Sequence, residues 1–244
     1  MECRLCFALA VTLVVPLFGD ENLKPTAQVS NTERIDFSPG GTIRIDRADG
    51  DLYVEGWDQP QVEMTIIKSL PYEHEASHPQ RLGQQLEAVQ VASERPSPSE
   101  LIISMHAPAR YGWLWHPTSP VDTSHVKLEY QLHVPRDSKL VIDHGVGLVS
   151  VRGVTGDIHA SCGRGDIVLW LPSTGTYSID ARSRLGKVYS DFPGDSISEF
   201  LVGQKFTNVN STASQRLFLR AGYGGITLKP ILAESEAPVT EVTK

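Results

Sequence analysis

A short unit recurs along the chain: a glycine, any residue, an apolar residue, any residue and a second apolar residue. Successive glycines of this unit at 147, 156 and 165 are 9 residues apart, as are those at 41 and 50. The clear copies start at Gly41, Gly50, Gly147, Gly156 and Gly165, and looser copies start at Gly175, Gly186 and Gly224. A regular spacing of this kind predicts one structural element that is built repeatedly.

Each unit has the pattern of a short β-strand. The apolar residues two and four places after the glycine point to one face, and the residues between them face water. A repeat this short leaves no room for a helix between strands, so tight turns must join them. One such strand buries too little apolar surface to be stable alone. We therefore expect an all-β fold, a solenoid-like or meandering stack of short glycine-started strands of the β-helix or toast-rack type.

The stretch between the two blocks of units is different in pattern. Leu82, Leu86 and Val89 follow helical spacing and predict one short helix, which Pro96 and Pro98 would end. The other alternating or apolar runs predict further strands, around Val62–Ile66, Leu101–Met105, Val126–Val134 and Leu217–Leu219.

The amino terminus has the features of a secretory signal. Arg4 precedes an apolar run from Leu5 to Phe18, which is shorter than the roughly 20 residues that span a bilayer. We expect cleavage near Gly19, and a retained anchor is the alternative. The predicted organisation is a signal peptide at 1–19, a flexible mature N-terminus at 20–34, a single β-repeat domain at 35–232 and a disordered tail at 233–244.

Cysteine usage adds little chemistry. Cys3 and Cys6 should leave with the signal peptide, which leaves Cys162 as the one cysteine of the mature chain. No intramolecular disulfide is then possible, and Cys162 is expected to be a buried thiol.

The glycine units also carry a family resemblance. The segments Gly50–Trp57, Val134–Pro135, Gly156–Ile158 and Gly165–Pro172 resemble the "putative adhesin" family of bacterial envelope proteins, also called toast-rack domains. The resemblance runs from about Ile35 to Leu232. It implies a noncatalytic, exported, all-β domain of unknown biochemical function, with relatives at the cell surface and in envelope-stress signalling. Two departures are the aromatic segment Tyr111–Pro120 and Ser190, which stands where the Gly186 unit should have its second apolar residue.

Charge excludes one class of partner. The chain has 22 basic and 29 acidic residues in 244, a net charge of -7. Such a protein repels nucleic-acid phosphates, so nucleic acid is not expected as a partner.

The segment His74–His78 matches the zinc-protease pattern H-E-x-x-H. That chemistry needs a helix, to place both imidazoles on one metal ion. Pro79 directly follows His78 and disfavours helical geometry there. We therefore expect no metal, no cofactor and no catalytic residue, and we keep a zinc-dependent hydrolase only as a remote alternative.

Three aromatic residues at every second position, Tyr111, Trp113 and Trp115, are the candidate contact for a partner or glycan. The alternative is that these side chains cover an open end of the β-stack.

Asp51, Asp157 and Asp166 each follow a unit glycine. If consecutive units stack directly, Asp157 and Asp166 lie close together, and calcium or nearby arginines would have to neutralise them. The other interpretation is that each aspartate bonds backbone in its own turn.

These observations predict an exported, noncatalytic structural or interaction domain of the bacterial cell envelope, periplasmic or at the cell surface, with an envelope protein or glycan as partner. No membrane span is expected in the mature chain. An extracytoplasmic sensor of envelope stress is the alternative, and a carbohydrate-active hydrolase is less expected because the sequence shows no paired carboxylates.

Overall fold

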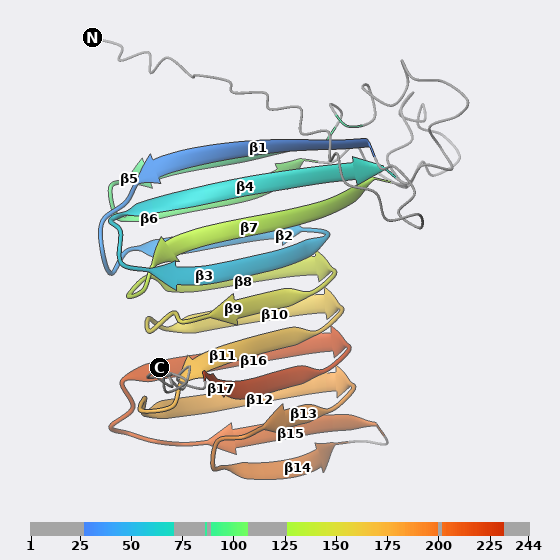
Figure 1. Ribbon diagram of the computed structural model, residues 1–244. Coiled ribbons are helices and arrows are strands. Elements are labelled where there is room, and N and C mark those ends of the chain that lie inside the picture. Colours follow the sequence, from blue (N-terminus) through green and yellow to red (C-terminus); the bar gives the residue numbers. More distant parts are fainter. Residues whose placement is uncertain (1–26, 71–85, 87–88, 107–125, 200–201, 232–244) are drawn as a thin grey trace, which may run out of the picture.

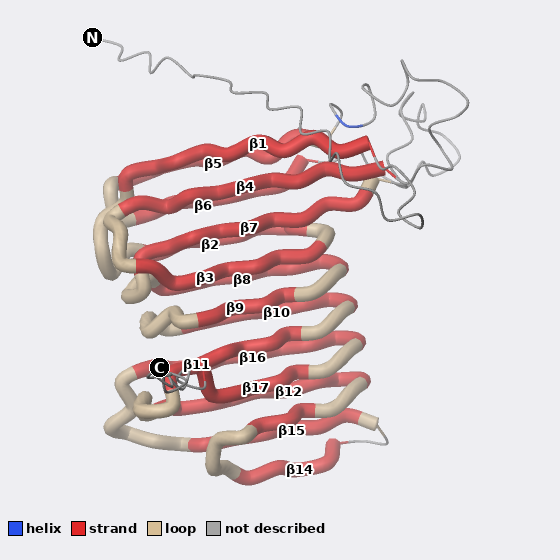
Figure 2. Tube along the Cα trace, in the orientation of Figure 1, coloured by secondary structure: helices blue, strands red, loops and turns tan. Residues whose placement is uncertain are grey.

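The computed structural model of the protein describes residues 27–70, 86, 89–106, 126–199 and 202–231. These residues form two mixed β-sheets, one of eight and one of nine strands, which lie against each other as two layers (Figures 1 and 2). The all-β prediction is confirmed. The short helix expected at Leu82, Leu86 and Val89 is not borne out: no helical element is found in the described chain, and most of that stretch lies outside it.

The eight-stranded sheet contains, in spatial order, β1 (Ala27–Asp36), β4 (Gln61–Leu70), β7 (Lys127–Pro135), β3 (Asp51–Trp57), β9 (Val149–Arg152), β11 (Ile167–Pro172), β17 (Ile226–Ile231) and β13 (Val188–Ser190). The nine-stranded sheet contains β14 (Asp195–Glu199), β15 (Gly203–Asn208), β12 (Tyr177–Leu185), β16 (Gln215–Tyr223), β10 (Ile158–Arg164), β8 (Lys139–Val146), β2 (Thr42–Ala48), β6 (Glu100–His106) and β5 (Gln90–Ser97).

All eight glycine units form strands, and units whose glycines are 9 to 11 residues apart alternate between the two sheets. Strand β8 lies in the nine-stranded sheet, β9 in the other, β10 beside β8 and β11 beside β9, both pairs being parallel. Two units therefore complete one coil, and the chain returns to the same sheet after 18 residues, as from Gly147 to Gly165. The first strand begins at Ala27, upstream of the position at which the pattern predicts the start of the domain.

The order of the coils differs from the order of the sequence. The last coil of the chain, β16 with β17, lies between the coil of β10 and β11 and the coil of β12 and β13 (Figure 1). Strands β16 and β17 therefore have a parallel neighbour on both sides in each sheet. The C-terminal coil is internal to the stack.

The core lies between the sheets and is built from the predicted inward positions. Ile167 and Leu169 of β11 are fully buried, and Ile158 and Ala160 of β10 face them from the other sheet at 0% and 2% exposure. Each aliphatic side chain of this size gains about 1.5–3 kcal/mol on burial. Ser190, which departs from the apolar pattern of its unit, lies on the short strand β13. Only Val188 of the three residues of this strand is buried.

A column of glycines follows one edge of the stack. Gly147 and Gly165 have φ angles of 129° and 136°, which other residues rarely adopt. A Cβ atom on Gly165 would lie 2.0 Å from the carbonyl oxygen of Gly147 in the preceding coil. Glycine is therefore required here twice, by its dihedral angle and by the close approach of neighbouring turns.

Candidate functional site

The candidate site lies on the solvent face of the eight-stranded sheet, where β3 runs between β7 and β9. The register places Gln131 and Ser150 on either side of Tyr53. It places His133 and Arg152 on either side of Glu55 in the same way. These six side chains occupy alternate positions of their strands, so they share one face while the residues between them point into the core.

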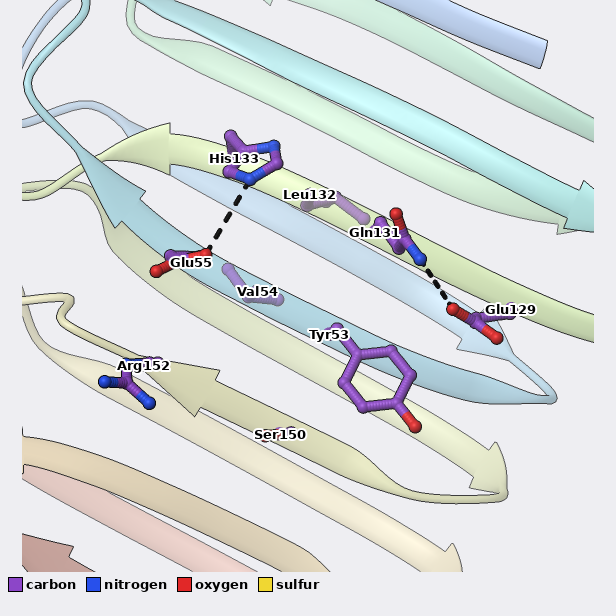
Figure 3. A pocket seen from close by; sticks show the side chains of 9 residues that line it. All are labelled: Tyr53, Val54, Glu55, Glu129, Gln131, Leu132, His133, Ser150 and Arg152. Atoms are coloured by element: carbon purple, nitrogen blue, oxygen red, sulfur yellow. Dashed lines mark hydrogen bonds and ion pairs between the residues drawn. The ribbon is translucent and has the colours of Figure 1, made fainter. Parts of the chain in front are cut away.

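These strands enclose a shallow depression of about 320 Å³. Figure 3 shows the polar side chains of β7, β3 and β9 around it, whereas Val54 and Leu132 belong to the buried layer beneath. The lining residues, called the β3 depression below, are Tyr53, Val54, Glu55, Glu129, Gln131, Leu132, His133, Ser150 and Arg152.

His133 stands between two carboxylates. Its Nε2 lies 3.8 Å from Glu55 Oε2, and its Nδ1 lies 3.6 Å from Glu63 Oε1. The imidazole also stacks on Trp57, with 5.3 Å between ring centroids and an angle of 26°. Trp57 is itself held by a hydrogen bond of 2.8 Å from its Nε1 to the carbonyl oxygen of Gln61. The ring of His133 is thus oriented by its stacking on Trp57.

The depression belongs to a longer row of charges that crosses the sheet. Directly paired positions on β1 and on the next six strands of the sheet carry, in spatial order, Arg34, Glu63, His133, Glu55, Arg152, Trp170 and Lys229. Arg34 forms an ion pair with Glu63 at one end, and Lys229 Nζ lies 5.5 Å from the ring centroid of Trp170 at the other. From Arg34 to Arg152 the two glutamates alternate with arginine or histidine side chains, and the row ends with Trp170 and Lys229.

Tyr53 is the aromatic residue of the depression and is 38% exposed. Partial burial raises the pKa of its hydroxyl above the ordinary value, and the carboxylates of Asp51 and Glu129 raise it further. The hydroxyl therefore keeps its proton at neutral pH and can donate a hydrogen bond. Glu129 in turn accepts a hydrogen bond of 2.6 Å from Gln131 Nε2, which fixes both side chains.

This arrangement is suited to reversible binding. It presents a tyrosine ring, carboxylates and a guanidinium on one open surface. Aromatic residues and arginine are also enriched where proteins bind partners. Exposed charges of alternating sign contribute more to the choice and orientation of a partner than to affinity.

The structure does not test the aromatic contact that the sequence predicts. Tyr111, Trp113 and Trp115 lie outside the described residues, as do the His74–His78 motif, the segment 1–19 and the tail 233–244. The residues of the β3 depression were missed. Tyr53 could have been noticed as an outward-facing aromatic residue on a predicted strand, but its neighbours on β7 are distant in sequence.

The aspartates that follow the unit glycines have a structural role. The carboxylates of Asp51, Asp157 and Asp166 each accept a hydrogen bond from the backbone N–H of a neighbouring coil. The donors are Leu148 at 3.0 Å, Arg216 at 2.9 Å and Gly225 at 2.6 Å. The expectation that Asp157 and Asp166 lie close together is wrong, because they stand at opposite ends of β10.

The described residues include neither a metal-binding cluster nor a reactive thiol. In the part of the chain that is described, no cluster of three or more histidine, cysteine, aspartate or glutamate side chains is arranged to hold a metal ion. Cys162 is a free, buried thiol, as predicted, and burial raises its pKa. A thiol with a raised pKa is a poor nucleophile at neutral pH.

No helix among the described residues is long and apolar enough to cross a membrane.

Comparison with known proteins places the chain near structures of low sequence identity. No protein-family model and no curated protein matches it. A "putative cell adhesion protein" of Clostridium sporogenes is 15% identical with a TM-score of 0.47, and the match covers 83% of this chain and 100% of that one. A "putative adhesin" of Bacteroides fragilis is 11% identical with a TM-score of 0.21, over 87% of this chain and 100% of that one.

A "putative lipid binding protein" of Parabacteroides distasonis is 9% identical with a TM-score of 0.23, over 66% of this chain and 70% of that one. The solved structures similar to this chain thus include putative adhesins, the group that its glycine-aspartate units resemble.

Proposed function

We propose that this protein is a noncatalytic interaction domain of the bacterial cell envelope, built as a β-repeat stack of the toast-rack type and exported before it acts. Its β3 depression is the contact surface for an envelope component. The observation that carries the proposal is the register of β7, β3 and β9, which gathers Tyr53, Glu55, His133 and Arg152 on one solvent-facing surface.

The openness of this surface favours binding over catalysis. Glu55 and Arg152 are exposed, and His133 is half-buried between carboxylates. Charges that remain in contact with water stabilise a transition state far less than charges in a dry, enclosed site. The same charges remain effective in steering and orienting a partner at the surface.

Binding of the purified mature chain to isolated cell envelopes tests the proposal. Tyr53→Ala should weaken saturable binding at least about tenfold, because an aromatic anchor of a binding surface commonly contributes more than 1.4 kcal/mol. Tyr189→Ala is the matched control, since Tyr189 is an exposed tyrosine on the same face, on the terminal strand β13. Equal binding by both variants and the parent would contradict the role of the depression.

Cell fractionation tests the site of action independently. The protein should be found in the periplasm or at the surface, with a mature amino terminus that begins near residue 20. Recovery of the uncleaved chain from the cytoplasm would overturn the envelope assignment even if the purified domain binds envelopes.

A further inference from the structure

The β3 depression offers donors and acceptors of hydrogen bonds side by side. Glu55 and Arg152 occupy directly paired positions of β3 and β9, and both side chains are exposed. The guanidinium of Arg152 forms no hydrogen bond or ion pair with any other described residue, so its donors are available to a ligand. Ser150, two residues before Arg152 on the same strand, adds a hydroxyl group beside Tyr53.

The two carboxylates of the depression can accept further hydrogen bonds although each already has a neighbour. Glu129 accepts one hydrogen bond from Gln131 Nε2, and Glu55 Oε2 lies 3.8 Å from His133 Nε2. An ionised carboxylate has about four lone-pair positions on its two oxygens. Both glutamates therefore keep positions for the hydroxyl donors of a ligand.

Charges of both signs lie close together in the depression, which disfavours a charged ligand. The Cβ atoms of directly paired strand positions are about 5 Å apart. An anion at Arg152 would approach the carboxylate of Glu55, and a cation at Glu55 would approach the guanidinium of Arg152. A hydroxyl group avoids both conflicts, because it can donate to a carboxylate and accept from a guanidinium.

The ring of Tyr53 supplies an apolar surface beside these polar groups. Figure 3 shows the ring leaning from β3 towards the neighbouring strand β9. In the part of the chain that is described, no aromatic ring or cation stacks on Tyr53. The face of an aromatic ring carries partial negative charge and attracts the C–H groups on the flat side of a sugar ring.

The row of paired residues that contains Tyr53 is uncharged over six neighbouring strands. From β1 to β11 its members are Thr32, Thr65, Gln131, Tyr53, Ser150 and Val168. All of them except Val168 carry a hydroxyl or amide group, which forms hydrogen bonds without a net charge. This row suits a neutral, hydroxyl-rich chain that crosses the strands, with Glu55 and Arg152 along one side of it.

We propose that the β3 depression binds an uncharged saccharide, with one sugar ring on Tyr53 and sugar hydroxyl groups between Glu55 and Arg152. The volume of about 320 Å³ lies at the lower end of the range of about 300–1,000 Å³ for small-molecule sites, which suits a short part of a saccharide chain. The inference rests on the proposed function, because it names the chemistry of the envelope component that this surface contacts.

Titration calorimetry of the mature chain with the neutral trisaccharides of glucose, galactose, mannose and N-acetylglucosamine tests the proposal. At least one of them should bind saturably. Its affinity should change less than about twofold between about 0.05 and 0.5 M NaCl, because salt screens pairs of charges and not the contacts of a neutral sugar. Trigalacturonate should bind at least about tenfold more weakly than the best neutral ligand, because its carboxylates approach Glu55 and Glu129.

Two variants with matched controls locate the bound sugar. Arg152→Ala should weaken binding at least about tenfold, because hydrogen bonds to a charged donor are lost. Arg216→Ala removes an exposed arginine of the other sheet and should bind within about twofold of the parent. Tyr53→Leu keeps an apolar side chain without the ring and should lose about fivefold, whereas Tyr189→Leu on β13 should not. Unchanged circular dichroism confirms that the variants are folded.

The saccharide and the proposed function can fail separately. If no trisaccharide of the panel binds while envelopes still bind in a manner that depends on Tyr53, the saccharide is wrong and the interaction domain stands. Loss of this envelope binding after protease digestion of the envelopes would also overturn the saccharide and would identify a protein partner. Equal affinity of the parent and the Arg152 and Tyr53 variants, or an affinity that falls further with salt than stated, would overturn it as well.

Discussion

His144 is a titratable residue on the inner face of the nine-stranded sheet, in the core between the two sheets. It lies on β8 at an inward position and is 2% exposed. Burial lowers the pKa of this imidazole below its ordinary value of 6.5, although the carboxylates of Asp49 and Asp51 oppose the shift. The folded protein therefore resists protonation of a group that the unfolded chain protonates readily.

We predict that the protein loses stability as the pH falls from 7 through about 6.5 and on towards the lowered folded pKa, because only the unfolded state gains a proton there. His144→Gln should flatten this dependence of the urea midpoint between about pH 5 and 7, a window above the usual range of carboxylates. His159→Gln, at an exposed position of β10, is the control and should keep the parent's slope. Identical slopes in all three proteins would show that His144 does not couple to folding.

At the scale of single strands, much of the fold was predictable from the sequence. Alternation of apolar and polar residues is a local signal, and the glycine that starts each unit marks the turn, so all eight units were found. Strands β14 and β15 were missed because Asp195–Glu199 and Gly203–Asn208 have few apolar residues. The helix predicted at residues 82–89 is not borne out in the described chain, and three apolar residues at i, i+4 and i+7 are weak evidence for a helix.

The turns between strands depend on the glycine column. Gly165 combines a φ of 136° with a Cβ position 2.0 Å from a backbone oxygen of the preceding coil. Gly40 has a positive φ of 71° as well, but its nearest neighbour is Asp137 Oδ2 at 3.8 Å. A comparison of alanine substitutions at the two positions therefore separates the free-energy cost of a positive φ from that of close packing.

We predict that Gly165→Ala destabilises the protein by about 2–6 kcal/mol, the sum of about 1–3 kcal/mol for backbone strain and about 1–3 kcal/mol for displaced neighbours. Gly40→Ala should cost only about 1–2 kcal/mol, because the backbone around it has room. Urea unfolding followed by circular dichroism measures both. A Gly165→Ala variant as stable as Gly40→Ala would mean that adjacent coils do not approach as closely as described.

At the scale of the whole molecule, the order of the coils could not be read from the sequence. Every unit offers the same inward apolar pair, so its local sequence does not determine which other unit it stacks on. Which units become neighbours depends on packing between segments that are distant in sequence. The C-terminal coil inserts between two earlier coils, and β7 lies beside β3 although more than 60 residues separate them. The β3 depression combines strands whose adjacency is set at this level, which explains why sequence patterns alone did not indicate it.

The internal position of the last coil leads to a prediction for hydrogen exchange. In an end-to-end array the terminal unit frays first, because it has a neighbour on one side only. Here the amides of β16 and β17 should exchange as slowly as those of β10 and β11, since all four strands are hydrogen-bonded on both sides. The edge strand β14, which precedes them in sequence, should exchange first. Mass spectrometry of the deuterated chain measures this order, and faster exchange of residues 215–231 than of 195–199 would mean that the C-terminal coil is not held inside the stack.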